Sequence, residues 1–94
     1  MEDGLVVEIE WDEGKRQKTL RERGLDFADV ALVDWEASLT LQDTRRDYGE
    51  VRYITYAKIG SRLCVIAWCY RDDVVRVVSL RKANKREMKR HEQG

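Results

Sequence analysis

The chain has 94 residues and no net charge at pH 7, with 18 Lys and Arg against 18 Asp and Glu. That length is typical of one domain, so residues 1–94 are predicted to form a single unit with one core. The longest apolar run, LCVIAWCY, is too short to span a membrane. The acidic start, MEDG, lacks the layout of a signal peptide, so we expect a cytoplasmic protein.

The first predicted elements are a short strand and a helix. In LVVEIEWD, residues 5–12, apolar and acidic residues alternate as in a half-buried strand. Asp12 is a good N-cap for a helix that begins at Glu13. The segment EGKRQKTLRERG consists mostly of helix formers, and Gly24 is expected to end it.

A second helix is predicted in FADVALVDW, residues 27–35, with Asp26 as its N-cap. The apolar residues of this segment are spaced so that an α-helix would place them along one stripe. The members of that stripe are Phe27, Val30, Ala31 and Trp35. The following segment, TLQDTRRDYGE, is polar and turn-rich, which indicates a weak strand and then a loop.

Three strands follow in close order, at residues 51–59, 62–70 and 74–80, and the breaks between them are short enough for antiparallel hairpins. Asn84 can cap a last, basic helix at residues 85–92. This order predicts an α+β fold, a curved antiparallel sheet with two N-terminal helices packed on it and a short C-terminal helix. The expected core includes Trp11, Phe27, Leu63, Val65 and Ile66.

The neutral total conceals an uneven distribution of charge. Residues 1–50 hold 7 Lys and Arg and 14 Asp and Glu, a balance of −7, whereas residues 51–94 hold 11 and 4, a balance of +7. Such a split is typical of a face that binds polyanions or of two faces with different partners. It also fits a well-solvated surface of both signs.

The two cysteines, Cys64 and Cys69, are five residues apart on one predicted strand. They should therefore point to opposite faces, where they cannot form a disulfide. The sequence contains neither a CxxC pair nor a cysteine–histidine cluster, so we expect no zinc site and no cofactor. Both residues are predicted to be small buried side chains.

Cations on the last predicted strand are the most informative polar residues. Alternation places Arg76 and Arg81 on opposite faces of VVRVVSLRK, each among apolar neighbours. A partly desolvated arginine needs a partner, which is either a carboxylate of the protein or a phosphate. Aromatic residues interleaved with such cations suit single-stranded RNA, although they also fill cores. Those residues are Tyr48, Tyr53, Tyr56, Trp68 and Tyr70.

Two segments resemble the BrnT family of toxins. WDEGKRQKTLRERGLDFADVA is similar to the opening of these proteins, with its W-D-x-x-K pattern. The stretch from DTRRDYGEVRY to KRHE is similar to the remainder, and SLRKANKRE is its most specific piece. The match extends from about residue 9 to residue 92 in the family's order and spacing.

The resemblance implies a RelE-like ribonuclease toxin of a type II toxin–antitoxin system, which inhibits translation and growth. It also implies neutralisation by a BrnA-type antitoxin, in a two-to-two assembly that binds operator DNA through the antitoxin. The chain departs from the family at Thr19-Leu20, at Glu22-Arg23 and at His91, where tyrosine is common. The residue that transfers protons therefore stays open.

The function predicted from these features is metal-independent RNA cleavage. Arg52, Arg76 and Arg81 are assigned to phosphate contact, with Lys82 assisting. His91, the only histidine, is the candidate acid or base, and it also fits a plain surface residue. The alternative is a non-catalytic module whose basic C-terminal face binds an acidic protein or a nucleic acid.

Overall fold

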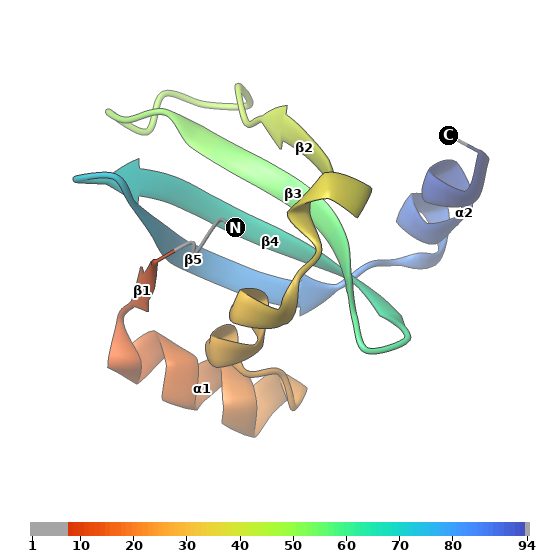
Figure 1. The fold of residues 1–94 in the computed structure, drawn as a ribbon, viewed down its shortest axis with the longest axis horizontal. Helices are drawn as coiled ribbons and strands as arrows, with labels where there is room; N and C mark the ends of the chain where they lie inside the picture. Colours follow the sequence, from red (N-terminus) through yellow and green to blue (C-terminus); the bar gives the residue numbers. More distant parts are fainter. Residues whose placement is uncertain (1–7, 94) are drawn as a thin grey trace, which may run out of the picture.

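The computed structural model describes residues 8–93 and shows an α+β fold (Figure 1). Five strands form one sheet in the order β1-β5-β4-β3-β2. The strands are β1 (Ile9–Trp11), β2 (Leu39–Gln42), β3 (Arg52–Ile59), β4 (Arg62–Arg71) and β5 (Val74–Lys82). The helices are α1 (Glu13–Arg23), the 3₁₀ helices η1 (Phe27–Leu32) and η2 (Trp35–Ala37), and α2 (Lys85–Gln93).

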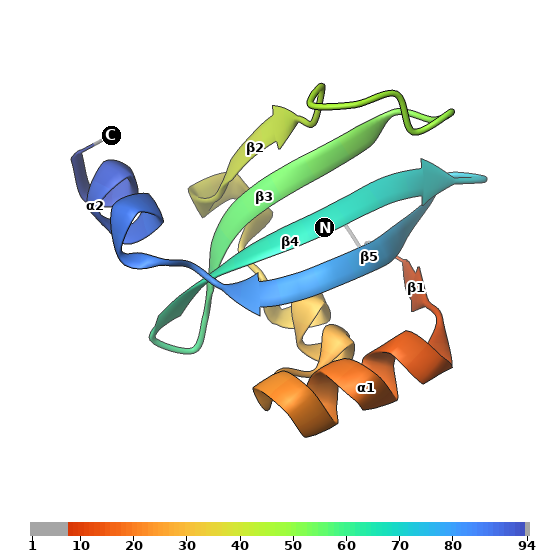
Figure 2. The same cartoon turned by 180° about the vertical axis from the view of Figure 1, so that it is seen from behind.

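The sheet is mixed, so the prediction of a wholly antiparallel sheet was wrong. Strands β2 to β5 pair antiparallel, but β1 pairs parallel with β5 at the edge of the sheet (Figures 1 and 2). A tight hairpin forces two strands to be antiparallel, whereas most of the chain separates β1 from β5. Residues 1–7, which include MEDG and the start of the predicted first strand, lie outside the described residues.

Helix α1 begins and ends where the sequence predicts. The Asp12 carboxylate accepts the Lys15 backbone N–H at 3.0 Å, and Gly24 adopts the left-handed conformation at φ 69°. The helix has no buried residue, and ionic contacts hold it instead. Arg16 pairs with Asp26 (Nε to Oδ1, 2.7 Å), and Arg23 donates to the Leu80 carbonyl at 2.8 Å.

The second predicted helix is not an α-helix. It forms the two short 3₁₀ helices η1 and η2, and Ala31 is exposed rather than part of the apolar stripe. Phe27, Val30 and Val33 are buried at a strict spacing of three residues, which is the period of a 3₁₀ helix. Asp34 is the N-cap of η2, because its carboxylate accepts the backbone N–H groups of Glu36 and Ala37.

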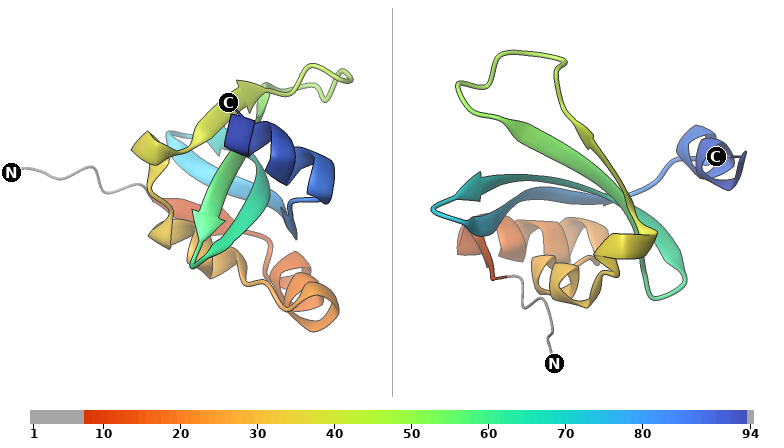
Figure 3. Two further views of the ribbon diagram at one scale, coloured as in Figure 1. Left: turned by 90° about the vertical axis from the view of Figure 1, so that its right-hand side faces the viewer. Right: turned by 45° about the horizontal axis from the view of Figure 1, so that its top comes forward.

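The core lies between η1 and one face of the sheet, as the right-hand view of Figure 3 shows with α1 and η1 on the same side. Buried polar groups in it are paired, since Trp68 donates its indole N–H to Thr55 Oγ1 at 2.7 Å. Four of the five predicted core residues are buried, while Trp11 is half-buried against the core. The central cluster is Phe27, Val30, Val33, Ala57, Cys64, Ile66, Trp68, Val75, Val77 and Leu80.

The hairpins and the last helix confirm their predictions. Gly60 has φ 65° in the β3–β4 turn, and Asp72 and Asp73 both have positive φ, 53° and 67°, in the β4–β5 turn. Asn84 accepts the Glu87 backbone N–H at 2.8 Å, and the Glu87 carboxylate accepts the Asn84 N–H at 2.9 Å, which forms a capping box. Among the described residues, none of the helices is long and apolar enough to cross a membrane.

A β-bulge in β5 changes the predicted direction of one arginine. Ala67 pairs with Ser79, but the next residue of β4, Trp68, pairs with Val77, so Val78 is the extra residue. The alternation therefore shifts by one, and Arg76 and Arg81 lie on the same face of the sheet, opposite the core. The prediction that they point to opposite faces was wrong for this reason.

Candidate functional site

The face of the sheet opposite the core, which we call the open face, carries Arg52, Arg76 and Arg81 in two cross-strand rows. In the arginine row, Arg52, Cys69, Arg76 and Glu10 are adjacent in register. In the tyrosine row, the adjacent residues are Leu39, Tyr56, Val65 and Arg81. The rows are four residues apart along β3, which corresponds to about 13 Å.

Each cation of the arginine row has a carboxylate partner within the protein. Arg76 donates to Glu10 (Nη1 to Oε2, 2.6 Å), and Arg52 donates to Glu50 (Nε to Oε2, 3.1 Å). Arg71 lies 3.8 Å from the other oxygen of Glu50. The Arg52 guanidinium also covers the ring of Tyr48, with 4.3 Å from its carbon to the ring centroid. The guanidinium groups are therefore held in fixed places.

Cys69 lies in the middle of the arginine row and is only 1% exposed. Burial raises the pKa of its thiol, and the nearby Glu50 carboxylate raises it further. The neighbouring Arg52 guanidinium in turn lowers the pKa of Glu50. The thiol is therefore neutral at working pH and acts as a small packing group. Cys64 and Cys69 are both buried and free, as predicted.

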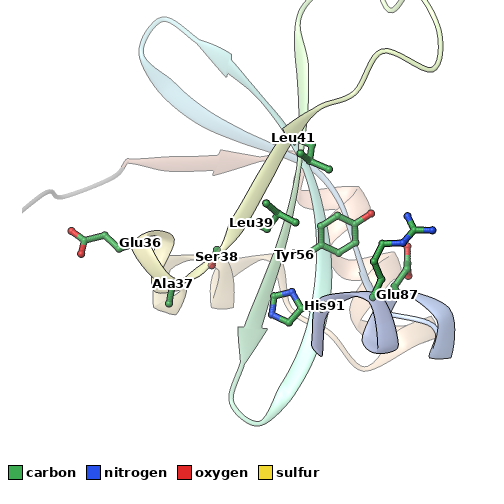
Figure 4. A pocket seen from close by; sticks show the side chains of 9 residues that line it. Glu36, Ala37, Ser38, Leu39, Leu41, Tyr56, Glu87 and His91 are labelled. Atoms are coloured by element: carbon green, nitrogen blue, oxygen red, sulfur yellow. The ribbon is translucent and has the colours of Figure 1, made fainter. Parts of the chain in front are cut away.

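The tyrosine row ends beside α2. Arg81 makes a bidentate pair with Glu87, through Nη1 to Oε1 at 2.8 Å and Nη2 to Oε2 at 2.9 Å. Hydrogen bonds from Arg81 hold the pKa of Glu87 down at about 2. His91 comes from the next turn of the same helix, and it lines one cavity together with Tyr56 (Figure 4). Arg81, Tyr56 and His91 thus surround one end of the open face.

The structure brings the predicted site residues together in two groups and leaves one apart. Arg52 and Arg76 share the arginine row, and Arg81 and His91 share the α2 end. Lys82 is exposed and pairs in register with Cys64, a core residue, so it does not share the open face. Within residues 8–93, no group of three or more His, Cys, Asp or Glu is placed to hold a metal ion.

Sequence reasoning missed the carboxylates that hold these arginines. Glu10 reaches Arg76 through the pairing of distant strands, which no local pattern specifies, whereas Glu50 lies only two residues before Arg52. Glu87 did carry a signal, because a glutamate three residues after Asn84 is the capping-box pattern. That pattern places its carboxylate at the start of α2, next to the end of β5.

The fold and the site define a small α+β domain that presents fixed arginine and tyrosine side chains on an open sheet face. The model of the family described as the ribonuclease toxin, BrnT, of type II toxin–antitoxin systems matches residues 11–87. That span is most of the chain, so the chain belongs to the BrnT family, as its segments indicated. Family membership implies an antitoxin partner.

A solved structure has the same fold. The crystal structure of the Brucella abortus ribonuclease toxin BrnT aligns with a TM-score of 0.68 at 25% sequence identity. The alignment covers 84% of this chain and 99% of that chain. No curated protein matches the sequence.

Proposed function

We propose that this chain is a metal-independent RNA endonuclease that acts in the cytoplasm and inhibits translation and growth. The observation that carries the proposal is the arrangement of Arg52, Arg76 and Arg81 on one face of the sheet, in a member of a ribonuclease toxin family. Guanidinium groups offer phosphate oxygens the same parallel N–H bonds that they now donate to carboxylates. The RelE-like character of the fold belongs to the same proposal.

The proposed reaction uses the RNA's own 2′-hydroxyl as the nucleophile. Its oxygen forms a bond to the adjacent phosphorus, the bond from phosphorus to the 5′ oxygen breaks, and the products are a 2′,3′-cyclic phosphate and a 5′-hydroxyl. A base must take the proton of the 2′-hydroxyl, and an acid must supply one to the leaving oxygen. The protein must also stabilise the charge that develops on the phosphate.

The two rows are assigned different parts of this reaction. They are about 13 Å apart, too far to hold a single phosphate. The α2 end combines Arg81 with His91, whose residue type exchanges protons near neutral pH. We therefore place the reacting phosphate there, and place another phosphate of the same strand, more than one nucleotide away, at Arg52 and Arg76. Lys82 contributes only general attraction.

We further propose that a BrnA-type antitoxin neutralises the chain in a two-to-two assembly, and that operator DNA is bound only through the antitoxin. Membership of the BrnT family supports this partner. The charge split along the sequence, −7 in residues 1–50 and +7 in residues 51–94, provides groups of both signs for such contacts.

Digestion of cellular RNA by the purified chain in EDTA tests the proposal. We expect cleavage that leaves cyclic phosphate ends, and growth arrest on expression that a co-expressed antitoxin reverses. The matched variant is Arg81→Ala, which should be soluble and should cleave RNA about 10²-fold more slowly. RNA binding without cleavage would instead support the non-catalytic binding module. Unimpaired growth at demonstrable soluble expression contradicts the toxin assignment.

A further inference from the structure

A cavity of about 280 Å³ lies between β2, β3 and α2 (Figure 4). Leu39 and Leu41 of β2 form its apolar side, Tyr56 of β3 adds an aromatic ring, and Arg90 and His91 of α2 lie opposite. The volume is slightly below the roughly 300 to 1,000 Å³ of pockets for drug-sized ligands. The cavity therefore fits a smaller group, of the size of one ring system.

The lining combines apolar side chains with flat rings at a place that water can enter. Leu39 and Leu41 remain 49% and 52% exposed and lie on the same face of one strand, so they form a small exposed apolar patch. Tyr56 and His91 supply planar surfaces, on which nucleic acid bases stack. A flat heterocycle with polar edges would cover the leucines and contact both rings.

The charges beside the cavity favour a nucleotide as the occupant. Arg90 lines it, and Arg81 lies two strands from Tyr56 in the same row, at about 10 Å. Of the two carboxylates at the cavity, Glu87 is already paired with Arg81. The other, Glu36, points away from Tyr56 and His91 in Figure 4. A base in the cavity would thus keep its phosphate close to guanidinium groups.

We propose that this cavity is the subsite for one unpaired nucleobase of the RNA, next to the phosphate that Arg81 holds. The inference rests on the proposed function and deepens it, because it gives the toxin a place to select the base beside the cut. An apolar side chain of the antitoxin is the competing occupant, and it would gain little from the adjacent arginines.

The experiment has two arms. One fills the cavity by a substitution in the protein, and the other removes a base from the RNA. Ala37 is an exposed residue at the cavity, so Ala37→Trp should occupy the space without disturbing the core. Ala31→Trp, on the exposed side of η1, is the matched control. Binding is measured by fluorescence anisotropy with a non-cleavable 2′-O-methyl heptanucleotide, and with the same strand made abasic at each position in turn. Circular dichroism checks folding, and Leu39→Thr is a second cavity variant.

We expect an abasic site at one position to weaken binding to the unchanged protein by about 10-fold, the size of one base stack. Ala37→Trp and Leu39→Thr should weaken binding of the intact strand and become insensitive to that abasic site, while Ala31→Trp behaves as the unchanged protein. If every variant binds the intact and the abasic strands with the same affinity, the base subsite is overturned, while the proposal that the chain binds RNA still stands. If the two cavity variants bind all strands as the unchanged protein does but lose binding to a labelled antitoxin in the same anisotropy assay, the cavity is a protein contact and the base subsite is overturned. No RNA binding by the unchanged protein overturns the RNA proposal itself.

Discussion

The two ends of the open face hold their arginines in different ways. In the arginine row, the partner of Arg76 is Glu10, which lies on the adjacent strand in register. At the α2 end, the partner of Arg81 is Glu87, which lies on a nine-residue terminal helix. The Arg76 side chain is also less exposed to solvent than that of Arg81, at 27% against 42%.

The difference indicates which ion pair can open. The pairing of β1 with β5 keeps the backbones of Arg76 and Glu10 side by side, whereas Glu87 can leave Arg81 if α2 moves as a unit. Phosphate oxygens accept the same two parallel N–H bonds that Glu87 accepts. The α2 end is therefore suited to exchange a carboxylate for a substrate phosphate, and the arginine row is suited to hold a strand in place.

The largest effect is expected from the loss of Arg81. Arg81→Ala should lower the single-turnover cleavage rate by about 10²-fold, the size seen when one oriented charge stabiliser is removed. Glu87→Gln is the control, since glutamine keeps the capping box but not the charge. If Glu87→Gln lowers the rate as much as Arg81→Ala, Arg81 serves to hold α2 and not the phosphate.

Arg76→Ala should act mainly on binding. We expect the RNA dissociation constant to rise several-fold and the salt slope of binding to fall by about 0.7, the value for one lost contact to a single strand. The single-turnover rate at saturating protein should stay close to that of the unchanged protein. A rate loss comparable to that of Arg81→Ala would remove the distinction between the two ends.

The Arg81–Glu87 pair predicts an acid-sensitive α2. Arg81 holds the folded-state pKa of Glu87 at about 2, below its ordinary value of 4.5. The pair therefore stabilises the protein fully above pH 4.5 and loses this contribution as the pH falls toward 2. NMR titration of the Glu87 carboxyl should show the low pKa, and Arg81→Ala should return it toward 4.5. An unchanged titration in that variant would mean that another group sets the pKa.

The smallest effect is expected at the β4–β5 turn, which belongs to neither end. Asp73 has φ 67°, a conformation that costs most residues about 1–2 kcal/mol and glycine far less. Asp73→Gly should therefore raise the free energy of unfolding by up to about 1 kcal/mol. Thermal unfolding measures this gain, and cleavage should not change. A lower midpoint would show that the turn depends on the aspartate side chain.

Much of the fold could be predicted from local chemistry. Asp12, Gly24 and Asn84 mark helix ends through hydrogen bonds with near neighbours, and short turns specify antiparallel pairing. The direction of β1 could not be predicted, because its partner β5 is distant in the sequence. The 3₁₀ period of Phe27, Val30 and Val33 was present in the sequence but also fitted an α-helix.

The site was predictable as a set of residue types but not as an arrangement. Arginines among β-branched residues correctly indicated charges that need partners, and for Arg76 and Arg81 those partners are carboxylates of the protein. Their identities depend on which strands and helices meet. The cavity beside Tyr56 was not predicted either, because it forms only where β2, β3 and α2 converge.

The bulge at Val78 makes β5 tolerant of both substitution and deletion at this one position. Val78 is half-buried and lies outside the central cluster, so exchanging its side chain should cost little. Deleting it would join its two chain neighbours, which already pair with consecutive residues of β4, so the ladder would become regular. Leu80 would stay on the core face and Arg81 on the open face. In the evolution of this chain, the loss of this extra residue would therefore leave both faces of the strand as they are.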